Sequence, residues 1–314
     1  MAAKRKQGLP AIGIVGLGNM GGGIARNFAK AGYPTCVWDS APPAQADFSK
    51  LKNATIAEPR EMAARCRTII FVVPSTPEIE EHCLGRNGIF ATARKGLVIY
   101  DFTTSDPAET RKLARKAARR EIAYLDAGMS GGAGGADKGT LTLMIGGDKR
   151  AFGRTRRHLE VIADKLFHLG PSGAGHTTKL IHNMVCHAVF LATCEGGRMA
   201  EKAGIELADL IDVFNVSNAR SNASQARFPD HILNEKWDGR SRVYNLYKDT
   251  GMAVDLAKAL GVDARLGADT HAFLARAMSL GMSEEDFTLV YRDFDKIKKA
   301  KPRRRAPKKG KKGM

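Results

Sequence analysis

The sequence predicts an α/β protein in which a doubly wound, parallel sheet precedes an all-helical C-terminal domain. Three observations lead to this prediction. Short apolar runs alternate with helical stretches over residues 11–170, as a parallel sheet with helical crossovers requires. A glycine-rich turn, Gly16–Gly21, directly follows the first apolar run. Beyond Gly173 the chain shows helical patterns and no convincing strand.

Seven short runs in the first half are expected to form the strands of the sheet. The run Thr68–Val73 is apolar throughout, as expected for a strand that helices cover on both faces. Helical segments lie between the runs, and Asp106–Ala118 opens with Asp106 as N-cap and Pro107 at the first helical position. The seven expected strands are Ala11–Val15, Thr35–Trp38, Thr68–Val73, Leu97–Phe102, Ala123–Asp126, Leu141–Ile145 and Leu166–Leu169.

A long helix is expected to join the two domains. The stretch from Ala174 to Ala203 contains no proline and is roughly 45 Å long if fully helical. Further helical patterns follow at Leu207–Val213, Arg227–Leu233, Leu246–Leu260, Gly267–Leu280 and Glu284–Lys299. We therefore divide the chain into a nucleotide-binding domain (1–170), a helical domain (171–295) and a C-terminal tail (296–314).

Length and composition indicate a globular protein. At 314 residues and 43% hydrophobic content, the chain is long enough for one large domain or two medium ones. No stretch approaches the roughly 18 uncharged apolar residues that a membrane span needs. The basic start precedes no apolar signal segment, and the five cysteines are scattered without a C-x-x-C pair. We expect free thiols, no contact with a membrane and a cytoplasmic location.

The net charge of +17 is concentrated at the C-terminal end. Eleven lysines and arginines and no acid lie from Lys296 onward. So basic and proline-broken a segment is expected to be disordered. It predicts at most a weak contact with polyanions, while a specific role toward nucleic acid or an acidic partner is the alternative.

The glycine-rich turn has the spacing and context of a dinucleotide-binding site. It lies between an apolar run and a helical segment, and a second expected strand follows. The first glycine permits a tight turn, the second lets the backbone approach a pyrophosphate, and the third allows close packing of helix and strand. The helix N-terminus then offers N–H donors to the phosphates. These features predict a Rossmann-type domain whose cofactor turn is Gly16, Leu17, Gly18, Asn19, Met20 and Gly21.

The second expected strand ends in an acid, Asp39, 18 residues beyond Gly21. A carboxylate at this position accepts hydrogen bonds from the ribose hydroxyls and repels a 2′-phosphate. No arginine follows it, so the sequence favours NAD over NADP. Two later strand ends are expected to belong to the same site. Val73 and Pro74 would wall the adenine–ribose region, and Thr104 would face the nicotinamide.

A third block, Gly173–Asn183, indicates the chemistry. On a helix it projects the amine of Lys179 and the carboxamide of Asn183 from one face, a single turn apart. Together with a nucleotide site, this pair suggests hydride transfer on an alcohol or carbonyl. The histidines of this stretch, His176, His182 and His187, have no spacing typical of a metal site, and we predict no metal.

Four ordered blocks resemble the β-hydroxyacid dehydrogenases, a family that includes 3-hydroxyisobutyrate, tartronate semialdehyde and 6-phosphogluconate enzymes. The blocks are Gly16–Gly21, Asp126–Gly147, Gly173–Asn183 and Lys248–Leu256. The resemblance covers residues 11 to about 290. In the second block, the family's common Asp-Ala-Pro-Val-Ser-Gly-Gly reads Asp126-Ala127-Gly128-Met129-Ser130-Gly131-Gly132.

The resemblance implies roles for particular residues. It makes Ser130, Gly131 and Gly132 the cradle of the substrate carboxylate, and it makes Lys179 the general acid/base. A free lysine has a pKa of about 10.4, so burial and a nearby cationic nicotinamide are expected to lower the pKa of Lys179. Asn183 would hold the substrate hydroxyl or carboxylate, and Lys248 would reach the cofactor or the substrate. Arg242 is a candidate for a polar substrate tail, although an exposed arginine is the simpler interpretation.

The sequence therefore predicts an NAD-dependent enzyme that interconverts a small 3-hydroxy acid and its semialdehyde. The small carboxylate substrate is its expected partner, and the resemblance implies a homodimer or homotetramer. One alternative is a 6-phosphogluconate-like oxidation with decarboxylation. Another is a non-catalytic cofactor-binding module whose basic tail binds nucleic acid, which the presence of Lys179 disfavours.

Overall fold

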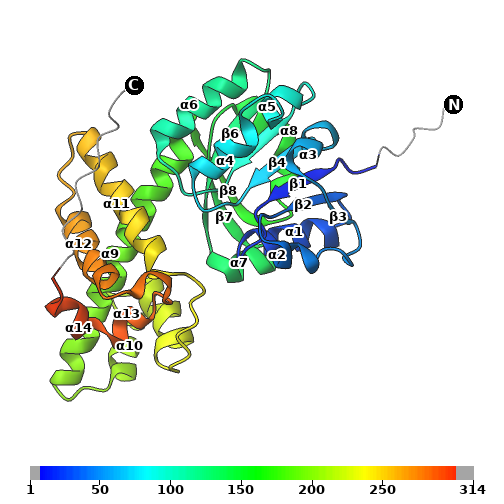
Figure 1. Ribbon diagram of the computed structural model, residues 1–314. Coiled ribbons are helices and arrows are strands. Elements are labelled where there is room, and N and C mark those ends of the chain that lie inside the picture. The colour runs from blue at the N-terminus through cyan, green and yellow to red at the C-terminus, as the bar shows by residue number, and fades with distance from the viewer. Residues whose placement is uncertain (1–7, 302–314) are drawn as a thin grey trace. The chain divides into compact units, whose positions relative to one another are not determined.

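The computed structural model describes residues 8–301 and divides the chain into two compact units, Met1–Lys179 and Leu180–Met314 (Figure 1). The first unit contains a sheet with helices and the second is helical, as predicted. The division falls inside the long helix α9 (Ala174–Lys202), beyond the expected boundary at residue 170. The first turn of α9 stays with the sheet because the chain is packed tightly there. A Cβ at Gly175 would lie 2.3 Å from the carbonyl oxygen of Met144.

The first unit contains one eight-stranded sheet in the order β3-β2-β1-β4-β5-β6-β7-β8. The chain order reverses between β1 and β4, which places a topological switch point at the carboxyl ends of these two strands. The strands are β1 (Ile12–Val15), β2 (Thr35–Trp38), β3 (Ala54–Ile56), β4 (Thr68–Phe71), β5 (Val98–Asp101), β6 (Ala123–Ser130), β7 (Leu141–Gly146) and β8 (Ala163–Gly170).

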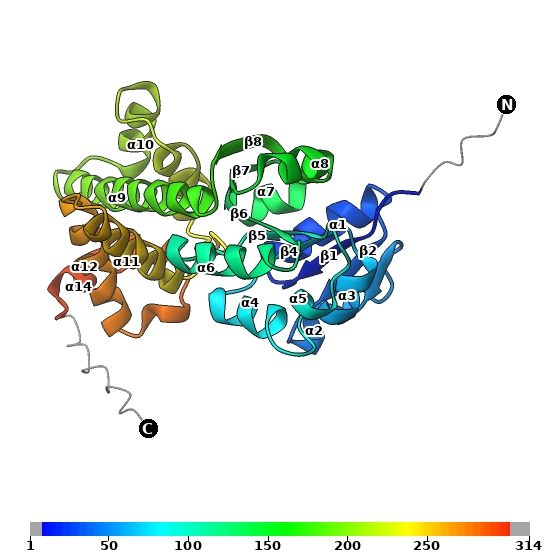
Figure 2. The ribbon, with the colours of Figure 1, turned by 90° about the horizontal axis from the view of Figure 1, so that it is seen from above.

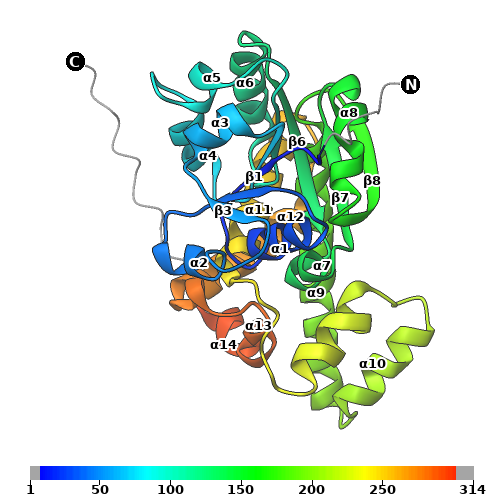
Figure 3. The ribbon, with the colours of Figure 1, turned by 90° about the vertical axis from the view of Figure 1, so that its right-hand side faces the viewer.

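Three details of the sheet differ from the prediction. β7 runs antiparallel to β6, although the sequence predicted a parallel sheet (Figure 3). Ser130 at the end of β6 pairs with Thr142 near the start of β7, so the segment between the two strands begins and ends at the same edge of the sheet. The short edge strand β3 was not predicted, since it is only three residues long and is mostly exposed. β6 and β8 are longer than expected, and β6 continues beyond Asp126 through Ser130.

Helices cover both faces of the sheet, and Figure 2 shows α7 and α8 on one side and α4 and α5 on the other. Alternate strand residues supply the two apolar cores. Ile12 and Ile14 of β1 belong to the core with α1, while Val15 belongs to the core with α3 to α6. The helices are α1 (Gly21–Lys30), α2 (Pro42–Ala46), α3 (Pro59–Arg65), α4 (Thr76–Cys83), α5 (Ile89–Thr92), α6 (Pro107–Ala118), α7 (Gly132–Lys138) and α8 (Lys149–Leu159).

The second unit is built around α9, α11 and α12, which follow the expected helical patterns. A π-helix, η1 (Ala223–Ile232), replaces the α-helix expected at Arg227–Leu233 and contains Pro229, which has no N–H to continue a helical ladder. The remaining elements are α10 (Leu207–Val216), α11 (Val243–Ala259), α12 (Arg265–Ser279), η2 (Met282–Glu284), α13 (Leu289–Arg292) and α14 (Phe294–Lys299). The last three replace the single helix expected at Glu284–Lys299.

The start of the predicted tail is wrong. Residues 296–299 belong to α14, and Ile297 is fully buried in the core of the second unit. Phe294 and Ile297 together bury the apolar face of this short basic helix. Residues 302–314 of the predicted tail lie outside the described residues. Among residues 8–301, no helix combines the length and the apolar character that a membrane crossing requires.

Candidate active site

The glycine-rich turn lies where β1 ends and α1 begins, at the switch point of the sheet. Gly16 has a φ of +95°, and a Cβ on it would lie 2.2 Å from the carbonyl oxygen of Val72. A Cβ at Gly21 would lie 1.9 Å from the carbonyl oxygen of Gly16, whereas a Cβ at Gly18 would meet nothing within 4 Å. The first and third glycines are therefore required by close packing. The open space at Gly18 fits the approach of a pyrophosphate.

Asp39 holds this turn in place from the end of β2. Its carboxylate accepts hydrogen bonds from the backbone N–H of Leu17 (2.6 Å) and of Ala41 (2.8 Å). Each carboxylate oxygen retains a further lone pair for a ribose hydroxyl. Asn19 is exposed at the tip of the turn, and Met20 is the N-cap residue of α1.

The loops after β4 and β5 lie beside the turn. Val73 contacts the position of Gly16, since a Cβ there would come within 3.2 Å of a Val73 methyl group. The backbone N–H of Val73 donates to the hydroxyl of Thr103 over 3.4 Å. Next to these residues, Pro74 is exposed and Thr104 is half-buried. Thr103 thus connects the two loops, and the contact of Thr104 with a nicotinamide stays a prediction.

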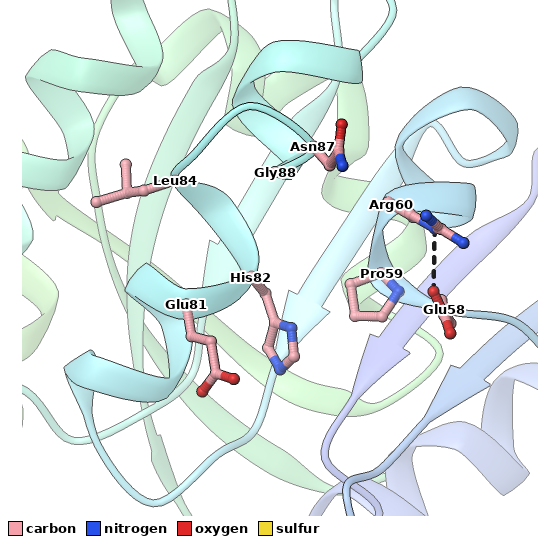
Figure 4. Close-up of a pocket in the computed structure, with 8 residues that line it drawn as sticks. All are labelled: Glu58, Pro59, Arg60, Glu81, His82, Leu84, Asn87 and Gly88. Carbon is pink, nitrogen blue, oxygen red and sulfur yellow. Dashed lines mark ion pairs between the residues drawn. The ribbon is translucent and has the colours of Figure 1, made fainter.

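A cavity of about 230 Å³ lies between the start of α3 and the end of α4. Figure 4 shows the imidazole of His82 extending from α4 towards Pro59, with Glu58 and Arg60 paired at the far side. The His82 ring meets the ring of Trp38 edge to face, with 4.6 Å between centroids. Burial lowers the pKa of His82 below its usual value, which favours the neutral ring. The cavity therefore adjoins the end of β2, directly before Asp39.

The predicted carboxylate cradle lies at the end of β6. Ser130 is the last residue of the strand, and Gly132 is the first residue of α7. Gly131 and Gly132 have φ values of +118° and +61°, which favour glycine. A Cβ at Gly132 would meet nothing within 4 Å, so its backbone is open to a small ligand. Consecutive peptide groups in such conformations form anion-binding concavities.

Lys179 lies directly against β6. It contacts the strand at Gly128, which precedes Ser130 by two residues. A Cβ at Gly128 would fall 2.4 Å from the Cβ of Lys179 and 2.9 Å from its Cγ. The family's common proline is replaced by this glycine, and here the side chain of Lys179 fills the space above it. The lysine is half-buried at the boundary of the first unit. The structure thus brings together two sites that are 49 positions apart in the chain, Lys179 and Ser130.

A buried carboxylate caps the helix that carries Lys179. Asp126 of β6 accepts hydrogen bonds from the backbone N–H groups of Gly173 (2.7 Å) and His176 (2.9 Å). Asp126 is fully buried. A negative charge at this place complements both the unpaired N–H groups and the dipole of α9. The strand that ends in the cradle therefore also positions the first turn of the lysine helix.

His176 extends this polar cluster to β5. Its Nε2 lies 3.1 Å from the carbonyl oxygen of Asp101, and its Nδ1 lies 2.7 Å from the hydroxyl of Thr110. Because a carbonyl oxygen only accepts, Nε2 carries a proton. Burial raises the pKa of Asp101, while His176 and the hydroxyl of Tyr124 act in the opposite direction. The sequence patterns did not predict this structural role of His176, which was assessed only as a metal ligand.

Within the second unit, Asn183, Asp249 and Lys248 form a polar cluster. The amide nitrogen of Asn183 donates to the carboxylate of Asp249 over 2.6 Å. The amide oxygen of Asn183 lies 3.0 Å from Nδ1 of His182. Lys248 forms an ion pair of 3.2 Å with Asp249, and both side chains are largely buried. Asp249 was part of a recognised sequence block, but its hydrogen bond with Asn183 was not predicted.

Arg242 is exposed, in agreement with the simpler interpretation of the sequence. Its guanidinium donates to Glu284 over 2.7 Å and lies over the ring of Tyr244, both on the surface. Its contact with a substrate stays a prediction. Within residues 8–301, no group of three or more His, Cys, Asp or Glu side chains has the arrangement of a metal site.

Two family models match nearly the whole chain. The NAD binding domain of 6-phosphogluconate dehydrogenase matches residues 11–170. The model described as NAD-binding of NADP-dependent 3-hydroxyisobutyrate dehydrogenase matches residues 173–294. The boundary between the two matches coincides with the start of α9. The two units of the structure therefore correspond to the two domains of one enzyme family.

Individual proteins lead to the same family. The chain is 34% identical to the probable mitochondrial 3-hydroxyisobutyrate dehydrogenase of Dictyostelium discoideum over 90% of both chains. It is 28% identical to 2-(hydroxymethyl)glutarate dehydrogenase of Eubacterium barkeri, over 91% of this chain and 95% of that protein. The solved 3-hydroxyisobutyrate dehydrogenase of Mycobacterium tuberculosis with L-serine has a TM-score of 0.80 at 28% identity, over 91% of this chain and 99% of that one. The chain belongs to the β-hydroxyacid dehydrogenase family of nicotinamide-dependent oxidoreductases.

Proposed function

We propose that this protein is an NAD-dependent dehydrogenase that interconverts a small 3-hydroxy acid and its semialdehyde. The observation that carries the proposal is the position of Lys179. Its side chain packs on Gly128 of β6, two residues before Ser130, and the backbone at Gly132 is open to a small ligand. An amine and an anion cradle at the end of one strand are suited to a substrate that has a hydroxyl close to a carboxylate.

In this proposal the substrate carboxylate accepts hydrogen bonds from the peptide groups of Ser130, Gly131 and Gly132. Lys179 takes the proton of the hydroxyl oxygen during oxidation and returns it during reduction. A positioned acid/base of this kind contributes a factor of roughly 10²–10⁴ to the rate. The nicotinamide ring, when bound, supplies the hydride acceptor. The turn at Gly16–Gly21 fits such a cofactor, because the backbone at Gly18 is open while that at Gly16 and Gly21 is fully packed.

Asn183 would hold the reacting oxygen from the next turn of the same helix. Its amide nitrogen is committed to Asp249, and this bond determines which way the carboxamide faces. The ion pair with Lys248 places an opposite charge beside Asp249 and fixes the carboxylate that orients Asn183. These contacts support a preorganised polar cluster in the second unit.

The preference for NAD over NADP rests on Asp39. Its carboxylate accepts from two backbone N–H groups and is therefore held at the end of β2, where a 2′-phosphate would add a second negative charge. The residues that follow are Ser40 and Ala41, neither of which is basic. We expect a higher kcat/KM with NAD than with NADP.

The test is cofactor reduction by the wild type and by Lys179→Ala over a panel of acids. The panel contains 3-hydroxyisobutyrate, glycerate, threonate, 3-hydroxypropionate, L-serine and 2-(hydroxymethyl)glutarate, each with NAD and with NADP. We expect activity on at least one acid, with a kcat that falls by roughly 10²–10⁴ in the variant.

Lys202→Ala is the matched control, because Lys202 lies on the same helix and is highly exposed. Its kcat should equal that of the wild type. Full activity of Lys179→Ala on the preferred acid would remove Lys179 from the mechanism. A wild type that binds the cofactor but oxidises none of the acids would contradict the proposed substrate class.

We also propose a homodimer or homotetramer. Ile181, Val185 and Val189 are each at least 38% exposed and recur once per turn on α9. Such a stripe is more apolar than a solvated helix face usually is, and a second copy of the chain would cover it.

A further inference from the structure

A small cavity in the second unit lies one turn beyond Asn183 on α9. Its volume is about 70 Å³, which is enough for a carboxylate-sized group. Cys186, His187 and Phe190 line it from α9, and Leu246 lines it from α11. On a helix these positions continue the face of Asn183, because they follow it by three, four and seven residues.

The cavity also adjoins Asp249, the partner of Asn183. Leu246 precedes Asp249 by three residues on α11, so it lies one turn back on the same face. Figure 2 shows α9 and α11 side by side, and the hydrogen bond from Asn183 to Asp249 joins them. Both helices therefore place the cavity next to the carboxamide that is proposed to hold the reacting oxygen.

Three polar side chains of this cavity, those of Arg227, Ser241 and Asn222, carry hydrogen-bond donors. Arg227 from η1 lies with its guanidinium carbon 5.2 Å from the ring centroid of Phe287, a cation–π contact. Within residues 8–301, Arg227 forms no ion pair. Ser241 accepts a hydrogen bond from Asn245, which leaves its hydroxyl proton to donate. Asn222 adds a carboxamide at the exposed rim.

Among the residues that the structure describes, no acidic side chain lines the cavity, so nothing on this wall neutralises Arg227. Phe190, Leu246 and Phe287 form a buried apolar floor, which strengthens the attraction between the guanidinium and an anion. Arginine binds carboxylates through two parallel hydrogen bonds. The segment that carries Arg227 is a π-helix, a geometry that often occurs at functional sites.

We propose that this cavity, with Arg227 as its main anchor, binds a second carboxylate of the substrate, so that the preferred 3-hydroxy acids are dicarboxylates. The inference rests on the proposed function, because it assumes that the reacting hydroxyl lies at Asn183. Four residues along a helix correspond to a rise of about 6 Å. The second carboxylate is thus separated from the reacting carbon by a spacer of a few carbons.

Three acids with the same 3-hydroxy acid core test this inference. 3-Hydroxyisobutyrate has a methyl group at C2, 2-(hydroxymethyl)pentanoate has a neutral propyl group, and 2-(hydroxymethyl)glutarate has a propionate group. We expect the wild type to oxidise the dicarboxylate with a kcat/KM roughly 10- to 100-fold above that of the neutral analogue, the range that a charged hydrogen-bonded contact supplies.

Arg227→Leu should remove this preference mainly through a higher KM for the dicarboxylate, and it should leave the kcat/KM for 3-hydroxyisobutyrate unchanged. Arg227→Lys should retain part of the preference, because it keeps the charge and loses the paired donors. Arg220→Leu, at an exposed arginine outside the cavity, is the matched control for the loss of one positive charge. Asn222→Ala, at the exposed rim, should weaken the preference without affecting folding.

The outcomes separate the inference from the proposed function. If the wild type oxidises all three acids equally, and Arg227→Leu changes none of the ratios, the second carboxylate site does not exist while the proposed function stands. If none of the three acids and none of the earlier panel is oxidised, both proposals are wrong. Arg227→Leu could also lose activity on 3-hydroxyisobutyrate, and then Arg227→Lys and Asn222→Ala decide. A weaker preference for the dicarboxylate in these two variants supports the site. An unchanged preference in both variants overturns it.

Discussion

At the scale of single residues, Asp126 connects β6, which ends in the proposed carboxylate cradle, to the helix of Lys179. It is buried, and it accepts two backbone hydrogen bonds from the start of α9. Asparagine has nearly the same size but only one acceptor oxygen, and its amide group would face an N–H donor. The position therefore depends on the charge and not only on the shape of the side chain.

We expect Asp126→Asn to lower the free energy of unfolding by about 1–3 kcal/mol, because a buried donor loses its charged acceptor. It should also lower kcat, since Asp126 holds the start of the helix that carries Lys179. Urea denaturation and steady-state kinetics measure the two effects. Asp148→Asn is the control, because Asp148 is an exposed N-cap of α8 and asparagine caps a helix equally well. Equal stability of Asp126→Asn and the wild type would contradict the capping role.

At the scale of elements, α14 changes how the basic tail should be removed. Ile297 is fully buried among the apolar residues of the second unit. A deletion that begins at Lys296 would remove this side chain, and the loss of a buried isoleucine costs about 2–5 kcal/mol. Such a deletion would confuse loss of folding with loss of function.

A deletion of residues 302–314 avoids this difficulty. We expect it to leave the thermal midpoint and the turnover of the hydroxy acid unchanged. It should weaken retention on a polyanionic resin at low salt, since it removes seven of the eleven basic residues that follow Asp295. Ile297→Ala in the full chain should lower the thermal midpoint instead. Loss of turnover in the short deletion would show that the tail takes part in catalysis, and would favour a function beyond the proposed enzyme.

At the scale of the whole molecule, one buried histidine makes the stability of the first unit depend on pH. Burial and the neighbouring Arg157 lower the pKa of His158 from 6.5 to about 4. The side chain is 3% exposed, and its Nδ1 lies 3.1 Å from the hydroxyl of Thr68. Below pH 6.5, His158 binds a proton in the unfolded chain, but in the folded chain it does so only below about pH 4. Stability is therefore full above pH 6.5 and falls as the pH is lowered.

We expect His158 to account for a loss of roughly 2 kcal/mol in the free energy of unfolding between about pH 7 and pH 5. His158→Gln, which keeps a hydrogen-bonding partner for Thr68, should show a correspondingly smaller loss over this range. The chain has two tryptophans, so the fluorescence of Trp38 in a Trp237→Phe background reports on the first unit during urea denaturation. The same pH dependence in both proteins would mean that His158 titrates normally in the folded state.

Local patterns predicted much of this molecule because each of them acts over a few residues. The turn at Gly16–Gly21, the strand Thr68–Phe71 and the long helix α9 depend on backbone freedom and on apolar periodicity, which are written in adjacent positions. The order of the four blocks was enough to indicate the family and to single out Lys179. The direction of β7 was not predicted. The segment between β6 and β7 would have the same composition if it crossed the sheet to start a parallel strand as it has when it turns back to start an antiparallel one.

The sequence by itself determined the fold class, the cofactor turn and the lysine helix. Only the tertiary structure decided which groups support them. Asp126 accepts a hydrogen bond from His176, 50 positions further along the chain, and Asn183 donates one to Asp249, 66 positions further along. Arg227 forms a cation–π contact with Phe287 in the wall of the small cavity. Such contacts arise when distant elements pack together, and no periodic pattern along the chain records which buried polar group will find which partner.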